Sequence, residues 1–371
     1  MLSLRNFWRR HRRKILVTAG VVGGGYFLYK LYSDYGRRVA DLEKQLERQR
    51  INDELIKAQL QAHFENVQRI AETATLPHAI HYLSSRIEEE LNLSNLTERL
   101  LQGKGQPNTL SSSEKLELWE RLKILSFTRM VVSLWAVTML SLYVRIQVNI
   151  LGRHIYIDTA RGLGSSYSLE DADFIDRDSE QNFLASADFL ASSGVPLFIS
   201  NMQAVVAEVL KEKQLRDVIN TTGLHETVSQ ILDIFMSAGS PHHWIEYLMP
   251  EDARFSKLAK TPSNDDTVPS DLTKFDQLMT ETRDVLSSAE FGDIVEISLK
   301  AVVGALMEDI AVQSGDSLTS GMPLARLLPR VIQVAPSLVD EPRKSRFIQI
   351  IQTVPDVELF FTLLYANAPN P

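Results

Sequence analysis

The sequence contains no cysteine among its 371 residues. That absence excludes a disulfide framework, a zinc site with cysteine ligands and a thiol nucleophile, and it fits a reducing compartment. The adjacent His242 and His243 would diverge on a helix, and no histidine spacing suits a metal. Phosphate-binding glycine loops and the GxSxG serine motif are also missing. The sequence therefore predicts no cofactor, no metal site and no enzyme.

An excess of positive charge occurs only at the start of the chain. Residues 1–14 carry six basic side chains and no acid. Because the whole chain has a net charge of −8, residues 15–371 carry −14. A nucleic-acid-binding protein is expected to show a basic stripe, so we predict no nucleic-acid partner. The basic residues instead precede an apolar run directly.

That apolar run, "ILVTAGVVGGGYFLY" (15–29), contains no charge. As a helix it spans roughly 22 Å, against about 30 Å for a hydrocarbon core, and the residues up to 33 bring it close to a thin bilayer. Aromatic residues at one end and the basic cluster at the other are typical membrane anchors. The sequence thus predicts a basic targeting segment (1–14), a single-pass anchor (15–33) and a large domain (34–371).

Two other interpretations of the run fit less well. A cleaved signal peptide needs a small-residue site after the run, but "KLYSDYGRRVADLEK" follows. An amphipathic surface helix would show two faces, whereas this run is apolar all round. The orientation stays open at this point: the basic flank favours a cytosolic N-terminus, while the absence of cysteine favours a cytosolic body.

The large domain is predicted to be all-α, as one elongated helical bundle. Apolar residues recur at helical spacing from residue 36 to 75, and we favour a long amphipathic helix there over a coiled coil. Prolines and glycines mark most of the later joints. The further predicted helices span residues 77–101, 113–151, 169–191, 196–219, 224–237, 271–290, 292–313, 323–335, 343–352 and 355–366.

Two stretches need separate interpretation. "MVVSLWAVTMLSLYV" (130–144) has no charge, but a second membrane span needs about 20 residues, so we predict a central core helix. "RHIYIDT" (153–159) alternates polar and apolar residues as a strand does. One short strand makes no sheet, so the all-α prediction stands.

The stretch "KLELWERLKILSFTR" (115–129) places a tryptophan among charges and leucines. On a helical wheel Leu118, Leu122 and Leu125 lie within an arc of about 60°. Trp119 lies roughly 60° beyond Leu122, with Lys115 between them. Such a face is typical of a groove that binds a partner's amphipathic helix, because tryptophan is enriched at binding hot spots. Alternatively, Trp119 is an ordinary residue at the boundary of the core, with its indole N–H toward solvent. The pattern alone leaves both open.

Several sequence blocks together resemble the peroxin-3 family, and its plant members in particular. "KLELWERLKILSFTR" is similar to the family's partner-binding segment. "RIQVNILGRHIYID", "YLMPED", "ETRDVL" and "MPLARLLP" also resemble family blocks, and so does the basic N-terminus with its short span. The resemblance extends over nearly the whole chain, and the segment around Trp119 is its most specific part.

The resemblance implies a peroxisomal membrane receptor that docks peroxin-19, the soluble chaperone carrying newly made peroxisomal membrane proteins. It implies that Trp119, Lys115 and Leu122 line the groove for the chaperone's N-terminal helix, and Leu118 on the same apolar face would contact that helix as well. It places Arg326 where other members have a lysine near the groove. It further implies that the N-terminus lies in the matrix and the helical body in the cytosol. The peroxisomal membrane and its lipids are then partners of the protein as well. The alternative is an organelle-surface tether that recruits inheritance, motility or degradation factors through other surfaces.

Overall fold

The computed structural model describes residues 44–51, 68–105, 111–164, 177–250, 274–339 and 345–366, with 54–55, 58–59, 61–62 and 65–66. The chain divides into two compact units, Met1–Ala62 and His63–Pro371. In the first unit, the described residues from 44 onward are helical. The targeting segment (1–14) and the anchor (15–33) lie outside the described residues and stay predictions.

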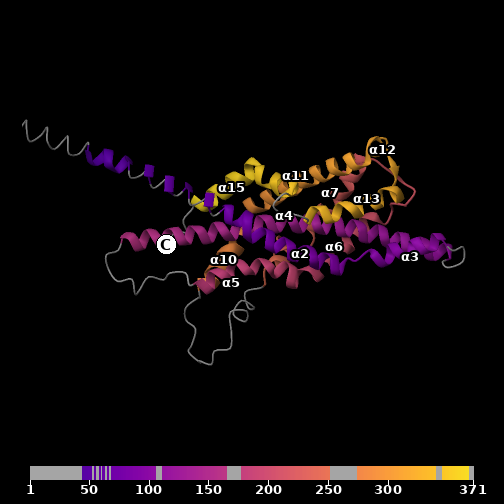
Figure 1. Ribbon diagram of the computed structural model, residues 1–371, viewed down its shortest axis with the longest axis horizontal. Helices are drawn as coiled ribbons and strands as arrows, with labels where there is room; N and C mark the ends of the chain where they lie inside the picture. Colours follow the sequence, from indigo (N-terminus) through magenta and orange to yellow (C-terminus); the bar gives the residue numbers. More distant parts are fainter. Residues whose placement is uncertain are drawn as a thin grey trace, which may run out of the picture. The chain divides into compact units, whose positions relative to one another are not determined.

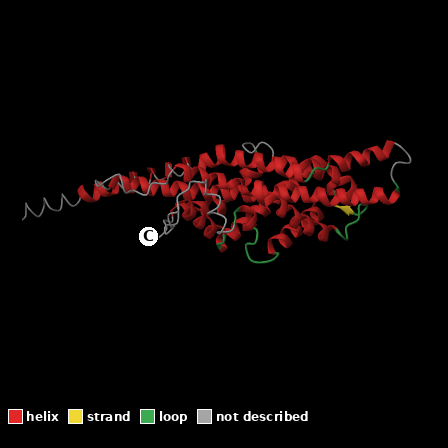
Figure 2. Ribbon diagram, turned by 90° about the horizontal axis from the view of Figure 1, so that it is seen from below, coloured by secondary structure: helices red, strands yellow, loops and turns green. Residues whose placement is uncertain are grey.

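The second unit is built from helices, with one short β ladder among the described residues (Figure 2). β1 (Val218–Ile219) pairs antiparallel with β2 (Met322–Pro323). The all-α prediction is confirmed. The helical elements are η1 (Ala71–Thr75), α2 (Leu76–Glu90), α3 (Ser94–Gly105), α4 (Ser112–Gly164), α5 (Arg177–Ala185), η2 (Ser186–Asp188), η3 (Leu190–Gly194), α6 (Val195–Leu210), α7 (Thr221–Ser237), α8 (Ile245–Leu248), α10 (Lys274–Leu286), α11 (Ala289–Ser314), α12 (Asp316–Thr319), α13 (Leu324–Val339), α14 (Arg346–Thr353) and α15 (Pro355–Ala366).

Helix α4 forms the centre of this unit. Figure 1 shows α11 and α15 above it and α2 and α6 below it, and α4 contacts all four as well as α13. From Met130 to Val144 its side chains are buried, almost all of them completely. Trp135 lies in the aromatic part of this core, with ring centroids 4.5 Å from Phe198 and 5.8 Å from Phe235. The prediction of a core helix at 130–144 is confirmed.

Apolar length alone would suggest further membrane spans in the described part of the chain. The helical stretches Ser112–Ile157 and Ser179–Leu210 are both long and apolar enough, as are α14 and α15 if their 67° bend is one broken span. However, 94% of the apolar window in the first stretch is buried inside the protein, against 44% in the second. The apolar side chains of the first stretch are therefore covered by neighbouring helices of the same protein.

The helix predicted at 77–101 differs from the structure at its start and in its middle. It does not begin at Pro77, because the π-turn η1 leads directly into α2. The backbone angles of Leu76, the first residue of α2, are already helical. The Leu76 N–H donates to the Ala71 carbonyl, five residues back, and the next residue, Pro77, has no N–H to place. The helix also breaks after Leu91, where the Asn92 side chain accepts from the Ser94 N–H and starts α3.

The strand-like stretch at 153–159 is helical, since α4 continues to Gly164. Distant partners hold this end of the helix. Arg153 donates to the Leu364 carbonyl at 2.9 Å and forms an ion pair with Glu281. The His154 Nε2 lies 2.7 Å from the other oxygen of the same carboxylate. These contacts with α10 and α15 override the local alternation.

Candidate partner-binding site

Helix α4 begins with a capping box at the edge of the predicted site. The Glu114 N–H donates to the Ser111 Oγ at 3.2 Å, and the Ser111 N–H donates to the Glu114 Oε2 at 2.7 Å. These two bonds satisfy donors that have no partner within the helix. They also lower the pKa of Glu114, chiefly through the Ser111 N–H. This cap fixes where Lys115 and Trp119 lie on the helix surface.

Three of the predicted site residues meet in a small apolar cluster. Leu118 and Leu122 are buried there, at 7% and 3% exposure, against Leu93, which directly precedes α3, and Leu96 in its first turn. Trp119 is partly buried and packs on the edge of this cluster, as do Leu100, Leu125 and Ile332 of α13. Helix α3 therefore already covers the leucines that were predicted to line a groove, and Trp119 keeps part of its ring exposed.

The exposed surface beside this cluster is formed by Lys115, Leu116 and Trp119, which we call the Trp119 face. Leu116 is 59% exposed, and Lys115 and Trp119 are partly exposed. On α4, Lys115 lies about 40° and Leu116 about 60° from Trp119, so all three point in similar directions. The face combines two apolar side chains with one cation, a composition that suits contact with a partner protein.

Lys123 is a buried cation that the sequence analysis did not single out. Its Nζ donates to the carbonyls of Leu210 (3.2 Å) and Lys213 (2.7 Å) and lies 2.6 Å from the Glu120 carboxylate. An ammonium has three donors, so all are used, and the side chain is only 3% exposed. Lys123 thereby caps the C-terminal end of α6, where carbonyls lack helical partners. A lysine three residues from a glutamate is typical of a solvated face, so no sequence signal could have found it.

Arg326 lies at the start of α13, a helix that packs directly on α4. The chain after α6 is bonded to the start of α13, where the N–H groups of Leu324 and Ala325 donate to the carbonyls of Asp217 and Leu215, each at 2.9 Å. Arg326 follows directly and is exposed. It lies outside the apolar cluster around Trp119. Of the five predicted site residues, the structure therefore brings four together on α4 and leaves Arg326 at the start of a neighbouring helix.

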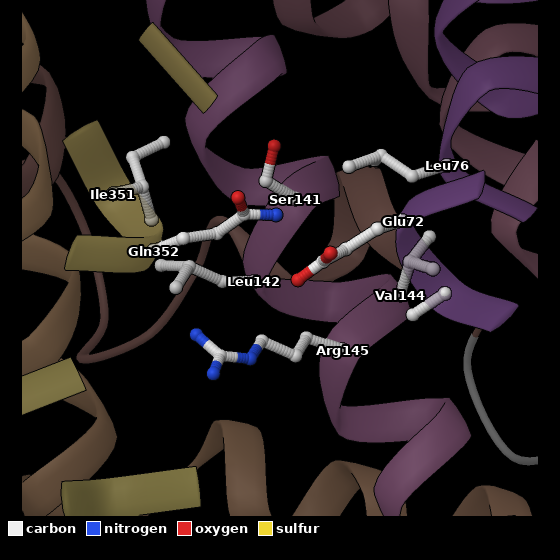
Figure 3. A pocket seen from close by; sticks show the side chains of 9 residues that line it. Glu72, Leu76, Ser141, Leu142, Val144, Arg145, Ile351 and Gln352 are labelled. Carbon is white, nitrogen blue, oxygen red and sulfur yellow. The ribbon is translucent and has the colours of Figure 1, made fainter. Parts of the chain in front are cut away.

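A second polar feature, far along α4, surrounds Arg145. Its Nε donates to the Gln68 Oε1 at 2.7 Å, and its guanidinium lies 4.4 Å from the centre of the Phe361 ring. Figure 3 shows Arg145 and Glu72 facing a small cavity, and Nη1 has no hydrogen-bond partner in the described residues. Burial lowers the pKa of Arg145, and Glu72 opposes that shift. With about 10 Å³ of space, the cavity is at the lower limit for a single water, so we interpret it as a structural site.

The chain matches the Peroxin-3 family over residues 6–114 and 102–367. It is 58% identical over 367 residues to peroxisome biogenesis protein 3-1 of Arabidopsis thaliana, covering 99% of both chains. It is 57% identical over 369 residues to protein 3-2 of the same plant, again with 99% of both covered. Against peroxisomal biogenesis factor 3 of Homo sapiens it is 28% identical over 393 residues, covering all of this chain and 98% of the other. The chain belongs to the Peroxin-3 family.

Proposed function

We propose that this peroxisome biogenesis protein is a docking receptor of the peroxisomal membrane, which receives the soluble chaperone peroxin-19. An amphipathic helix of the chaperone binds the Trp119 face, and the chaperone delivers newly made membrane proteins there. The N-terminal anchor (15–33) holds the receptor, with its short N-terminus in the matrix and the helical body in the cytosol. No reaction is catalysed. Family membership and the resemblance of residues 115–129 to the partner-binding segment support this proposal.

The observation that carries the proposal is the exposure of apolar side chains at the start of α4. Trp119 keeps part of its ring exposed beside the largely exposed Leu116, on a helix that is buried farther along, from Met130 to Val144. Trp residues in such positions are enriched among binding hot spots. Lys115 on the same face would meet an acidic group at the rim of the bound helix.

The structure changes what Leu118 and Leu122 are expected to do. Because α3 covers both, a partner helix reaches them only if α3 moves away from α4. Leu122→Ala is therefore expected to destabilise the free protein by about 2 kcal/mol or more, as buried leucines do. Trp119→Ala should instead weaken docking while leaving the fold largely intact.

The test is isothermal titration of the full-length protein in detergent with the N-terminal peptide of peroxin-19. Trp119→Ala is expected to cost at least about 2 kcal/mol of binding, which is roughly thirtyfold in affinity. Arg121→Glu, on the opposite side of α4, serves as the control and should bind as the wild type does. Unchanged affinity of Trp119→Ala, at unchanged helical content by circular dichroism, would refute the assignment of the site. No binding by the wild type would refute docking itself.

A further inference from the structure

A second surface feature, a cleft, opens beside the apolar cluster of Leu118 and Leu122. It has a volume of about 560 Å³ and lies between the end of α2, α3, α4 and the start of α6. Pockets for specific ligands usually occupy about 300–1,000 Å³. Arg121 and Leu125 are the α4 residues in its wall, and Arg121 points about 160° away from Trp119 around the helix. The cleft therefore opens away from Trp119, although Leu96 and Leu125 belong both to its wall and to the apolar cluster on which Trp119 packs.

The charges in the cleft are mainly positive, although the body of the protein is acidic. Arg99 of α3 and Arg121 of α4 both line it, and neither has an ion-pair partner within 4 Å among the residues that the structure describes. The acid in its wall, Glu90, is held by Arg86 at 3.3 Å. Arg99 also lies near enough to Glu114 to help lower the pKa of that carboxyl, but it forms no ion pair with it within 4 Å. Two arginines without such ion pairs at one cleft attract carboxylates, which guanidinium groups bind in a bidentate manner.

The rest of the lining combines apolar and amide groups. Leu96, Leu125 and Ile199 provide apolar surface, and Leu96 and Ile199 are each only 7% exposed. Asn95 and Gln203 add amide groups that can both donate and accept hydrogen bonds. A free inorganic anion would use the arginines and leave this surface unused. An extended peptide uses all three kinds of group, because it brings carboxylates, apolar side chains and main-chain amides together.

We propose that this cleft binds a short acidic peptide segment of a protein partner. Arg99 and Arg121 bind its carboxylates. Leu125 and Ile199 contact an apolar side chain between them, and Asn95 and Gln203 bind its main chain. This second interaction surface is separate from chaperone docking and does not depend on Trp119.

The test is fluorescence anisotropy of the full-length protein in detergent with a short fluorescein-labelled peptide of alternating glutamate and leucine. A peptide of alternating glutamine and leucine controls for apolar binding. The variants are Arg99→Glu and Arg121→Glu, with Arg216→Glu as the matched charge control, since Arg216 is an exposed arginine outside the cleft. Trp119→Ala separates this site from the docking face.

The proposal expects binding of the glutamate peptide that weakens at least about tenfold in each of the two cleft variants. Arg216→Glu and Trp119→Ala should leave it unchanged. Equal losses in Arg216→Glu and the cleft variants would mean non-specific charge attraction and would overturn the proposal. Equal binding of the glutamine peptide, or no binding of either peptide, would also overturn it. Displacement of the glutamate peptide by the soluble headgroup glycerophosphoserine would assign the cleft to lipid instead.

Discussion

The buried ammonium of Lys123 provides a direct test of how the Trp119 end of the protein is held together. Lys123→Met keeps the length and apolar stem of the side chain but removes all three of its polar contacts. Glu120 is 40% exposed and regains water. The carbonyl of Leu210, a fully buried residue, loses a charged donor, and so does that of Lys213.

The magnitude follows from these contacts. A hydrogen bond to a charged group contributes about 1.5–3 kcal/mol, and removing one partner of a buried ion pair costs about 3–5 kcal/mol. Glu120 is partly solvated, and the energies of the hydrogen bonds and of the ion pair do not add. We therefore expect a loss of stability below the sum of these energies. Lys123→Met should lower the free energy of unfolding by about 3 kcal/mol.

The assay is denaturant unfolding of the full-length protein in detergent, followed by hydrogen exchange of the amides near residues 210–217. The control is Lys211→Met, whose ammonium is exposed and 3.9 Å from the Glu208 carboxylate. This control should lie within about 0.5 kcal/mol of the wild type. If Lys123→Met were as stable as Lys211→Met, with equal exchange at the end of α6, Lys123 would not be the cap described here.

Two further predictions concern glycine packing and acid titration. A Cβ at Gly194 would lie 2.2 Å from the Tyr247 carbonyl oxygen, so Gly194→Ala should lower the unfolding temperature, whereas Gly304→Ala, in helix α11 with nothing within 4 Å, should raise it slightly. The lowered pKa of Glu114 means that its capping contribution is complete above the ordinary glutamate pKa and is lost as the pH falls through the lowered value. Carboxyl NMR should show this low midpoint, and Ser111→Ala should move it part of the way up; a midpoint at the ordinary value in the wild type would contradict the capping box.

The fold was predictable where one local signal dominates. The 224–237 and 355–366 predictions match α7 and α15 closely, because glycine, asparagine or proline marks their ends. The uncharged run at 130–144 could be assigned to the core because it is too short for a bilayer and continues as helix on both sides. In these cases the sequence around each element contains the physical cause of the structure.

The sequence could not predict features whose cause lies far along the chain. The helical state of 153–159 depends on Glu281 and Leu364, which are more than a hundred residues away. The capping role of Lys123 depends on where α6 ends.

The break after Leu91, by contrast, could have been predicted from Asn92 and Ser94, which form a local start signal for α3. That break decides the candidate site, because it places the leucines of α3 over Leu118 and Leu122.

Helix α3 packs on the apolar cluster beside the Trp119 face and also lines the cleft, and this predicts a coupling between the two sites. Its Leu96 packs with Leu118 and Leu122 and also lines the cleft, which Arg99 lines as well. A peptide bound in the cleft holds α3 against α4. A chaperone helix that reaches Leu122 must move α3 away, so each ligand should weaken the other by the same factor.

The coupling is measured by titrating the peroxin-19 peptide into the full-length protein with and without saturating glutamate-leucine peptide. We expect weaker docking in its presence, and Arg121→Glu should abolish the difference because it removes the cleft ligand and leaves the Trp119 face intact. If docking were the same with and without the cleft peptide, α3 would stay in place when the chaperone binds. Docking would then use only Trp119, Leu116 and Lys115, and Leu118 and Leu122 would act solely in the core.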